Sequence, residues 1–165
     1  MAILRLSKIL SVYAIALFAS LVVFGNIADY DTNKAFVEHV FSMDTLFSGE
    51  HIRWRSITSP RIQTLGYLLI ITAETLTAVL CWWGATRLLY ALRRPASAFN
   101  KQKSVAIAGL TVGFLTWQVA FMSIGGEWFG MWMSQKWNGV PDAFRFFITI
   151  LMVLIYLIQR DDECR

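Results

Sequence analysis

The sequence predicts an all-α membrane protein: an antiparallel four-helix transmembrane bundle with a small helical cap formed by its outer loops. Hydrophobic residues make up 56% of the chain and charged residues 16%, whereas soluble proteins average about 45–50% and about 25%. The apolar residues are gathered into four long runs, and the mean hydropathy is +0.52. These observations exclude a disordered chain, a coiled coil and a soluble enzyme of ordinary build.

Each apolar run has the length or the flanking signals of a membrane-spanning helix. The first three hold about 20 residues, which cross a hydrocarbon layer of ~30 Å at ~1.5 Å per residue. The first lacks a clean signal-peptide cleavage site and is expected to be an uncleaved anchor. The fourth is extended by Pro141 and Asp142, which suit a first helical turn. The chain is thus expected to be a single membrane domain, 1–165, with spans at 9–28, 65–85, 105–125 and 141–158.

The lysines and arginines are distributed unevenly between the segments that connect these runs. Nine lie in the two terminal tails and loop 86–104, and five lie in loops 29–64 and 126–140. Positive residues accumulate on the cytoplasmic side of a membrane. Both termini and loop 86–104 are therefore expected to be cytoplasmic, and loops 29–64 and 126–140 to be outer loops.

The first outer loop contains a predicted amphipathic helix over 33–48. Phe36, Val40, Met43 and Phe47 recur there at helical spacing, with polar residues between them. Such a helix covers the bundle or lies on the membrane surface. The alternative is a docking surface for a partner.

The same loop then places Trp54 between two arginines, Arg53 and Arg55. This pattern is typical of an interfacial anchor. The alternative is a site for lipid phosphates or an acidic partner.

The third loop contains the most distinctive run of the chain, GGEWFGMWMSQKWNG over 125–139. An aromatic belt at the membrane interface explains the tryptophans, but it does not require the flanking glycines, which predict specific backbone turns. We therefore predict an outer interaction surface made of Trp54, Trp128, Phe129, Trp132 and Trp137.

This run, together with four spans and a short basic cytoplasmic loop, resembles a bacterial family of predicted small four-span integral membrane proteins of unknown function. The residues that carry the resemblance are GGEWF, the later tryptophans and WNG. The resemblance implies a place in the bacterial inner membrane. It brings no substrate, cofactor or catalytic residue.

Polar residues within the spans are costly and usually have a partner or a task. Counted from the outer ends of the spans, Glu74 lies about 15 Å deep and Gln118 about 10 Å deep. Three interpretations compete: hydrogen bonds between helices, a proton or cation site at Glu74, and a pocket for a lipid or quinone-like headgroup. The predicted intramembrane polar cluster consists of Asn26, Glu74, Gln118, Glu127 and Arg145.

Two glycines on the third span, Gly109 and Gly113, form a GxxxG pattern. Such glycines let helix backbones approach closely. The pattern suits packing inside the bundle and a homodimer contact equally well.

The sequence contains no pattern that predicts catalysis or a cofactor. His39 with Glu38 and His51 with Glu50 offer a weak metal site, but solvated loop residues are the expected interpretation. Both histidines, His39 and His51, lie in the first outer loop, and no phosphate-binding loop or catalytic triad spacing occurs. The basic loop 86–104 suits an anionic membrane surface, so nucleic-acid binding is not predicted.

The leading functional hypothesis is a non-enzymatic inner-membrane protein, an accessory subunit or self-assembling scaffold that acts through its outer loops. Its expected partners are membrane lipids and either further copies of itself or a larger membrane complex. The alternative is a small oligomeric transporter or channel in which Glu74 is a proton- or cation-linked site and Gln118 and Asn26 line the route. A membrane enzyme ranks third.

Overall fold

The computed structural model describes residues 2–48 and 51–161. Arg165, one of the nine positive residues counted above, lies outside these ranges. The described residues contain no β-strand, only an isolated bridge between Leu46 and Ser134. The helices are α1 (Ala2–Ala28), α2 (Tyr30–Ser42), α3 (Pro60–Tyr90), α4 (Ala96–Lys101), α5 (Lys103–Leu115), the π-helix η2 (Thr116–Trp128) and α6 (Val140–Ile158), with 3-10 turns η1 (Arg53–Arg55) and η3 (Met131–Met133).

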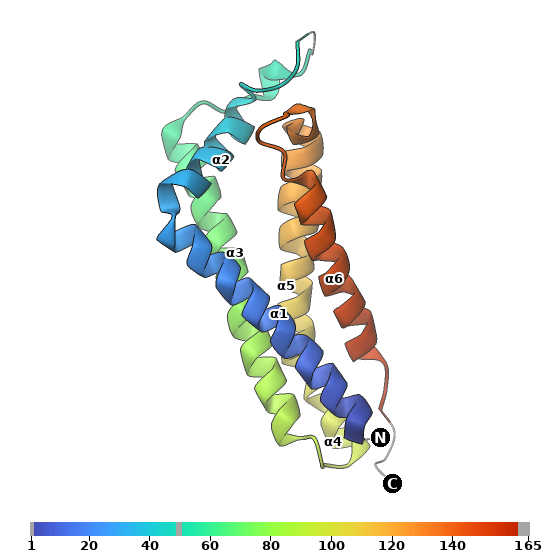
Figure 1. Ribbon diagram of the computed structural model, residues 1–165. Coiled ribbons are helices and arrows are strands. Elements are labelled where there is room, and N and C mark those ends of the chain that lie inside the picture. The colour runs from blue at the N-terminus through green and yellow to red at the C-terminus, as the bar shows by residue number, and fades with distance from the viewer. Residues whose placement is uncertain (1, 49–50, 162–165) are drawn as a thin grey trace.

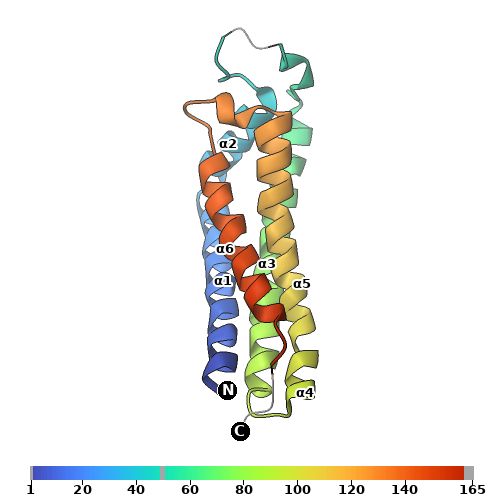
Figure 2. The same ribbon diagram turned by 90° about the vertical axis from the view of Figure 1, so that its right-hand side faces the viewer.

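Four of the described helical stretches are long and apolar enough to cross a membrane: α1, α3, the succession α4–α5–η2, and α6. Helices α1 and α5–η2 lead away from the end that holds both termini, and α3 and α6 return to it (Figures 1 and 2). Helix α3 packs against both α1 and α5, and α6 packs against α5 and η2. The predicted fold class, an antiparallel four-helix membrane bundle, is confirmed.

The helices extend beyond the expected spans, and each span lies within one of the four helical stretches. Helix α1 begins at Ala2 rather than residue 9, and α3 covers 60–90 rather than 65–85. Most of the expected cytoplasmic loop 86–104 is also helical, because only 91–95, which ends in the helix breaker Pro95, and the single turn residue Gln102 interrupt the helices there. Hydropathy marks the apolar part of a helix and misses its polar ends.

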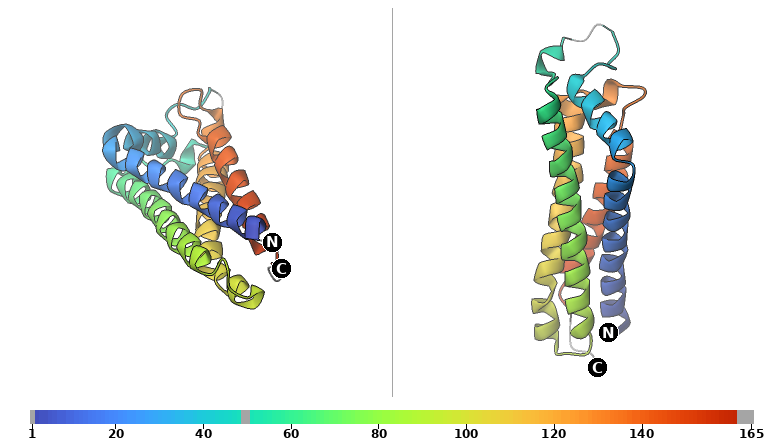
Figure 3. Two further views of the ribbon diagram at one scale, coloured as in Figure 1. Left: turned by 60° about the horizontal axis from the view of Figure 1, so that its bottom comes forward. Right: turned by 90° about the vertical axis from the view of Figure 1, so that its left-hand side faces the viewer.

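Small residues bring α3 and α5 into close contact. A Cβ atom added to Gly109 would lie 2.9 Å from Cys81 Sγ, and one added to Gly113 would lie 2.8 Å from Thr77 Cγ2. The GxxxG pair therefore serves packing inside the bundle, one of its two predicted roles. Figure 3 shows the neighbouring pair formed by α1 and α3 from two further directions.

The third span changes its winding at Thr116 and continues as a π-helix to Trp128. Gly125 and Gly126, which predicted backbone turns, lie inside this helix. The prediction of turns was wrong for this pair, and the helix continues past residue 126, the expected start of the loop, to Trp128. The turn comes at Gly130, where φ is +64°.

A cap consists of α2, η1, η3 and the loops between them, at the end of the bundle opposite the start of α1 (Figure 2). Helix α2 ends at Ser42, because Met43 adopts a left-handed conformation with φ 54°. The predicted helix over 33–48 is therefore too long at its C-terminal end. Beyond it, Leu46 pairs with Ser134, and Thr45 and Ser134 share a side-chain hydrogen bond of 2.8 Å. The two loops expected on the outer side thus form one unit.

Candidate functional site

The buried carboxylate of Glu74 lies on α3 at the centre of a small polar group. Asn26 on α1 donates a hydrogen bond from Nδ2 to Glu74 Oε2, 2.7 Å away. Tyr67, about two helical turns before Glu74 on the same face of α3, donates its hydroxyl hydrogen to the backbone oxygen of Asn26 at 2.8 Å. Glu74 and Tyr67 are 1% and 2% exposed. These bonds hold α1 and α3 together and fix the direction of the carboxylate.

Glu74 faces a cavity of about 230 Å³. The cavity lies between α1, α2, α3, η2 and α6, so every spanning element contributes to its wall. Its polar lining residues are Asn26, Asn33, Tyr67, Glu74 and Asp142, and its aromatic ones, besides Tyr67, are Phe36, Trp117, Phe121 and Phe146.

The electrostatics of this cavity favour a positive ligand. Its lining includes two carboxylates, Glu74 and Asp142, and no lysine, arginine or histidine among the described residues. The nearest cation to Asp142 is Arg145, whose Nη1 lies 3.2 Å from Oδ1, and both side chains are exposed. Glu74 has no such ionic partner among the described residues. Its hydrogen-bonding neighbour is the neutral side-chain amide of Asn26.

The structure brings together only two of the five residues predicted to form the polar cluster, Asn26 and Glu74. Gln118 is half-buried on η2 and does not line the cavity, and its backbone oxygen accepts a hydrogen bond from Ser123. Glu127 is exposed near the end of η2, and Arg145 is exposed on α6. Asn33, Tyr67 and Asp142 were missed. Asn33 and Asp142 reach the cavity only through the folded arrangement of α2 and α6, whereas Tyr67 lies seven residues before Glu74 on α3, a spacing that the sequence does contain.

The predicted outer aromatic surface is partly occupied by contacts within the chain. Arg55 lies between Trp54 and Trp128, with its guanidinium 5.3 and 4.9 Å from the two ring centroids. Trp132 meets Phe47 edge-on at 6.0 Å. These three tryptophans remain between 47% and 73% exposed.

The other two residues of that surface are more enclosed. Phe129 is 3% exposed and stacks on Phe41 at 4.8 Å, so it belongs to the core of the cap rather than to its surface. Trp137 stacks on His39 at 4.6 Å, and the His39 ring nitrogen Nδ1 lies 2.7 Å from Asp44. The first and third loops thus hold each other by aromatic contacts.

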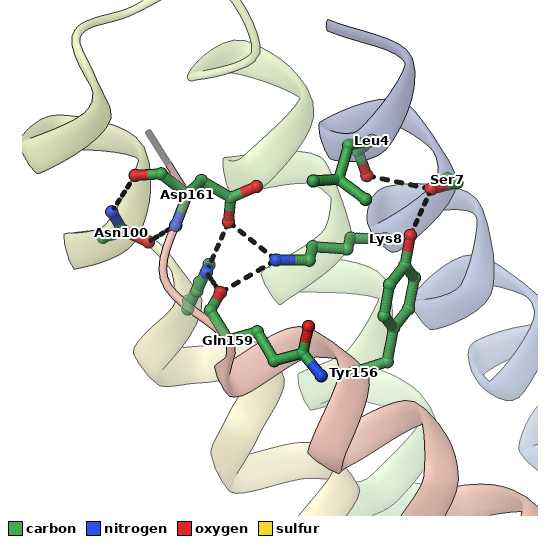
Figure 4. Close-up of polar contacts among 8 residues, drawn as sticks. Leu4, Ser7, Lys8, Asn100, Tyr156, Gln159 and Asp161 are labelled. Carbon is green, nitrogen blue, oxygen red and sulfur yellow. Dashed lines mark hydrogen bonds and ion pairs between the residues drawn. The ribbon is translucent and has the colours of Figure 1, made fainter. Parts of the chain in front are cut away.

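A second buried polar group lies at the end of the bundle that holds the termini, and sequence reasoning missed it. Lys8 of α1 and Lys103 of α5 place their Nζ atoms 2.9 and 2.6 Å from the same oxygen of Asp161 (Figure 4). Both lysines also donate to the backbone oxygen of Gln159. All three charged side chains are nearly inaccessible.

The segment after α6 is fixed from its other side by Asn100. Asn100 donates to the backbone oxygen of Asp161 at 3.0 Å and accepts from its N–H group at 3.2 Å (Figure 4). Burial opposes the charged form of Asp161, but Lys103 and Lys8 outweigh it and hold the pKa of this carboxyl below its usual range. In the sequence, these lysines looked like solvated cytoplasmic charges.

Comparison with known proteins supports the membrane assignment. Residues 4–160 match the family described as "Predicted small integral membrane protein (DUF2165)". No curated protein matches the chain. No solved structure matches it either.

Proposed function

This chain belongs to the DUF2165 family of small integral membrane proteins, and from that premise we propose that it binds a small organic cation, such as a protonated amine, in the cavity beside Glu74. The observation that carries the proposal is a buried carboxylate without an ionic partner in the described chain, facing a cavity without a positive lining residue. A charge in such a place is costly unless an opposite charge meets it.

The walls of the cavity suit the same class of ligand. Trp117, Phe121, Phe146 and Phe36 present aromatic rings around it. A cation within about 6 Å of a ring face is attracted by it, most strongly by tryptophan. Asn26 and Tyr67 supply oxygen atoms that accept hydrogen bonds from an ammonium group.

The size of the cavity limits the ligand. Pockets for drug-sized molecules enclose about 300–1,000 Å³, and this cavity measures about 230 Å³. A small amine or a quaternary ammonium ion with short substituents fits these limits. Larger amphiphiles do not.

We place the cavity in the outer half of the membrane of a bacterial cell, with both termini cytoplasmic. The excess of lysine and arginine in the tails and in 86–104 supports this orientation. The ligand would then enter from outside, beneath α2 and the third loop. Transport of the cation requires a path past Glu74 to the other side, which an oligomer or a second conformation would supply.

The Glu74→Gln variant tests the proposal. Glutamine keeps the hydrogen-bonding capacity toward Asn26 but removes the charge, so we expect affinity for tetramethylammonium to fall by about tenfold or more. Isothermal titration calorimetry of the full chain in nanodiscs measures this. The matched control is Glu127→Gln, which removes the same charge from an exposed position outside the cavity and should leave affinity within about twofold.

Equal affinity of wild type and Glu74→Gln, or an equal loss in Glu127→Gln, contradicts the proposal. Flux of the same ion into liposomes then separates two forms of the function. Flux that disappears in Glu74→Gln identifies a transporter, whereas binding without flux identifies a binding protein.

A second candidate function is supported by the cap. Phe47, Trp54, Trp128 and Trp132 are about half exposed or more, and all belong to the unit formed by the outer loops. Tryptophan is enriched among the residues that dominate binding energy at protein interfaces. This surface suits an accessory subunit or a self-assembling scaffold that contacts its partner outside the membrane.

Purification of the tagged chain in gentle detergent, with the mass and composition of the eluted complex, tests this second function. We expect a stoichiometric second subunit or a homo-oligomer, and Trp132→Ala should reduce its recovery severalfold because a half-exposed ring contributes little to folding. Trp83→Ala is the control, since Trp83 is 56% exposed but lies on α3 away from the cap. A monomer without companions rules this function out.

A further inference from the structure

A basic pocket of about 160 Å³ lies at the end of the bundle that holds the termini, where α3 gives way to α4. Figure 1 shows this turn at the same end of the bundle as the start of α1 and the end of α6. The pocket is lined by Arg87, Tyr90, Ala91, Arg94 and Gln102. It is separate from the Glu74 cavity, and neither function proposed above uses it.

The side chain of Arg87 is held in place by contacts within the chain, and the backbone that carries Arg94 is fixed, while the Arg94 side chain is exposed. Arg87 donates a hydrogen bond from Nε to Gln102 Oε1 at 2.8 Å, and its guanidinium lies 5.8 Å from the ring centroid of Trp83. Arg5 donates to the backbone oxygens of Leu92 and Arg94, at 3.1 and 2.8 Å, and thereby fixes the turn. Preorganised guanidinium groups bind planar or tetrahedral oxyanions with less loss of conformational entropy.

Little negative charge opposes these arginines within the described residues. The segment 86–104 contains no aspartate or glutamate. The described carboxylate at this end, Asp161, is buried and already bound by Lys8 and Lys103. The pocket is therefore a site of positive potential beside the membrane surface.

We infer that this pocket binds the phosphate group of an anionic phospholipid, with Arg87 and Arg94 as its two ligating side chains. Guanidinium groups bind phosphate oxygens by charge-assisted, often bidentate, hydrogen bonds. The lipid, rather than free phosphate, is indicated by the exposed aromatic side chains next to the pocket. Trp83 is 56% exposed and Tyr90 is 79% exposed, and such rings lie at the headgroup level of a bilayer.

Native mass spectrometry of the full chain, titrated with phosphatidylglycerol or phosphatidylcholine in detergent, tests the inference. We expect wild type to prefer phosphatidylglycerol, and Arg94→Gln and Arg87→Gln each to weaken its binding by about tenfold. Arg93→Gln is the matched control. It removes the same charge from the adjacent, exposed residue, which does not line the pocket, and should change binding less than about twofold.

Arg94→Lys separates charge from geometry, because lysine keeps the charge but lacks the planar fork of donors. We expect it to bind less tightly than wild type and more tightly than Arg94→Gln. An equal loss in Arg93→Gln and Arg94→Gln would show diffuse attraction rather than a site and would overturn the inference. Inorganic phosphate that binds wild type as tightly as the lipid does would overturn the assignment to a phospholipid.

Discussion

Asp161→Asn is expected to destabilise the folded protein by about 3 kcal/mol, since removal of one partner from a buried ion pair leaves the other charge uncompensated. Here one carboxylate is shared by two ammonium groups, of Lys8 and Lys103, that are 1% and 3% exposed. The substitution also loosens the segment that closes the bundle after α6. Thermal unfolding in detergent, followed by circular dichroism, measures the effect.

Two controls separate this cause from a general loss of charge. Lys8→Met leaves Lys103 and Asp161 as a neutral pair, so it should cost less than Asp161→Asn. Asp142→Asn removes an exposed acid at the other end of α6 and should cost less than about 1 kcal/mol. If Asp161→Asn were as stable as Asp142→Asn, the buried cluster would contribute nothing to stability.

The same residue predicts a pH dependence. The pKa of Asp161 is lower in the folded protein than in the unfolded chain, where it is about 3.9. The contribution of Asp161 to stability is therefore complete at a pH above its pKa in the unfolded chain. It is lost as the pH falls through its pKa in the folded protein. Wild type should lose this part of its stability below about pH 4, and Asp161→Asn should lack it at every pH.

The fold class was predictable because a membrane imposes two simple requirements, apolar length and satisfied backbone groups. Four apolar runs, opened by residues such as Pro60 and Pro141, satisfy both. Helix ends were less predictable. Lys8 and Lys103 look like loop charges in a sequence, but each lies within a helix. Both are buried and form an ion pair with Asp161, a residue 58 or more positions away in the chain.

The candidate site was predictable only in part. Glu74 and Asn26 belong to the predicted polar cluster and do meet, although the depth count placed Glu74 nearer to Gln118 than to Asn26 at the end of the first expected span. Gln118 has a suitable depth, but it follows the change to π-helical winding at Thr116. Bonding from i to i+5 widens the turn, so side chains beyond that point leave the positions that a period of 3.6 predicts. A single sequence carries no signal for that change.

Gly84→Ala is expected to destabilise the protein by about 3 kcal/mol, because α3 and α5 touch through this residue. A Cβ atom on Gly84 would overlap the backbone nitrogen and Cα of Ala106 as well as its side chain. A flexible side chain can move aside, but helix backbone cannot without separating the helices. Overpacking of a close contact costs about 1–3 kcal/mol, and a contact with backbone lies at the upper end. Thermal unfolding in detergent measures the loss.

Gly25→Ala makes the same chemical change with the opposite expected result. Gly25 lies within α1, and apart from its chain neighbours and the local helix backbone no atom lies within 4 Å of the position its Cβ would take. Alanine is favoured over glycine in a helix by about 0.5–1 kcal/mol, so this variant should match or exceed the stability of wild type. Because both variants add one methyl group to a membrane helix, any difference between them measures the contact of α3 with α5. Equal stabilities would mean that the two helices do not pack as closely as Gly84 and Ala106 require.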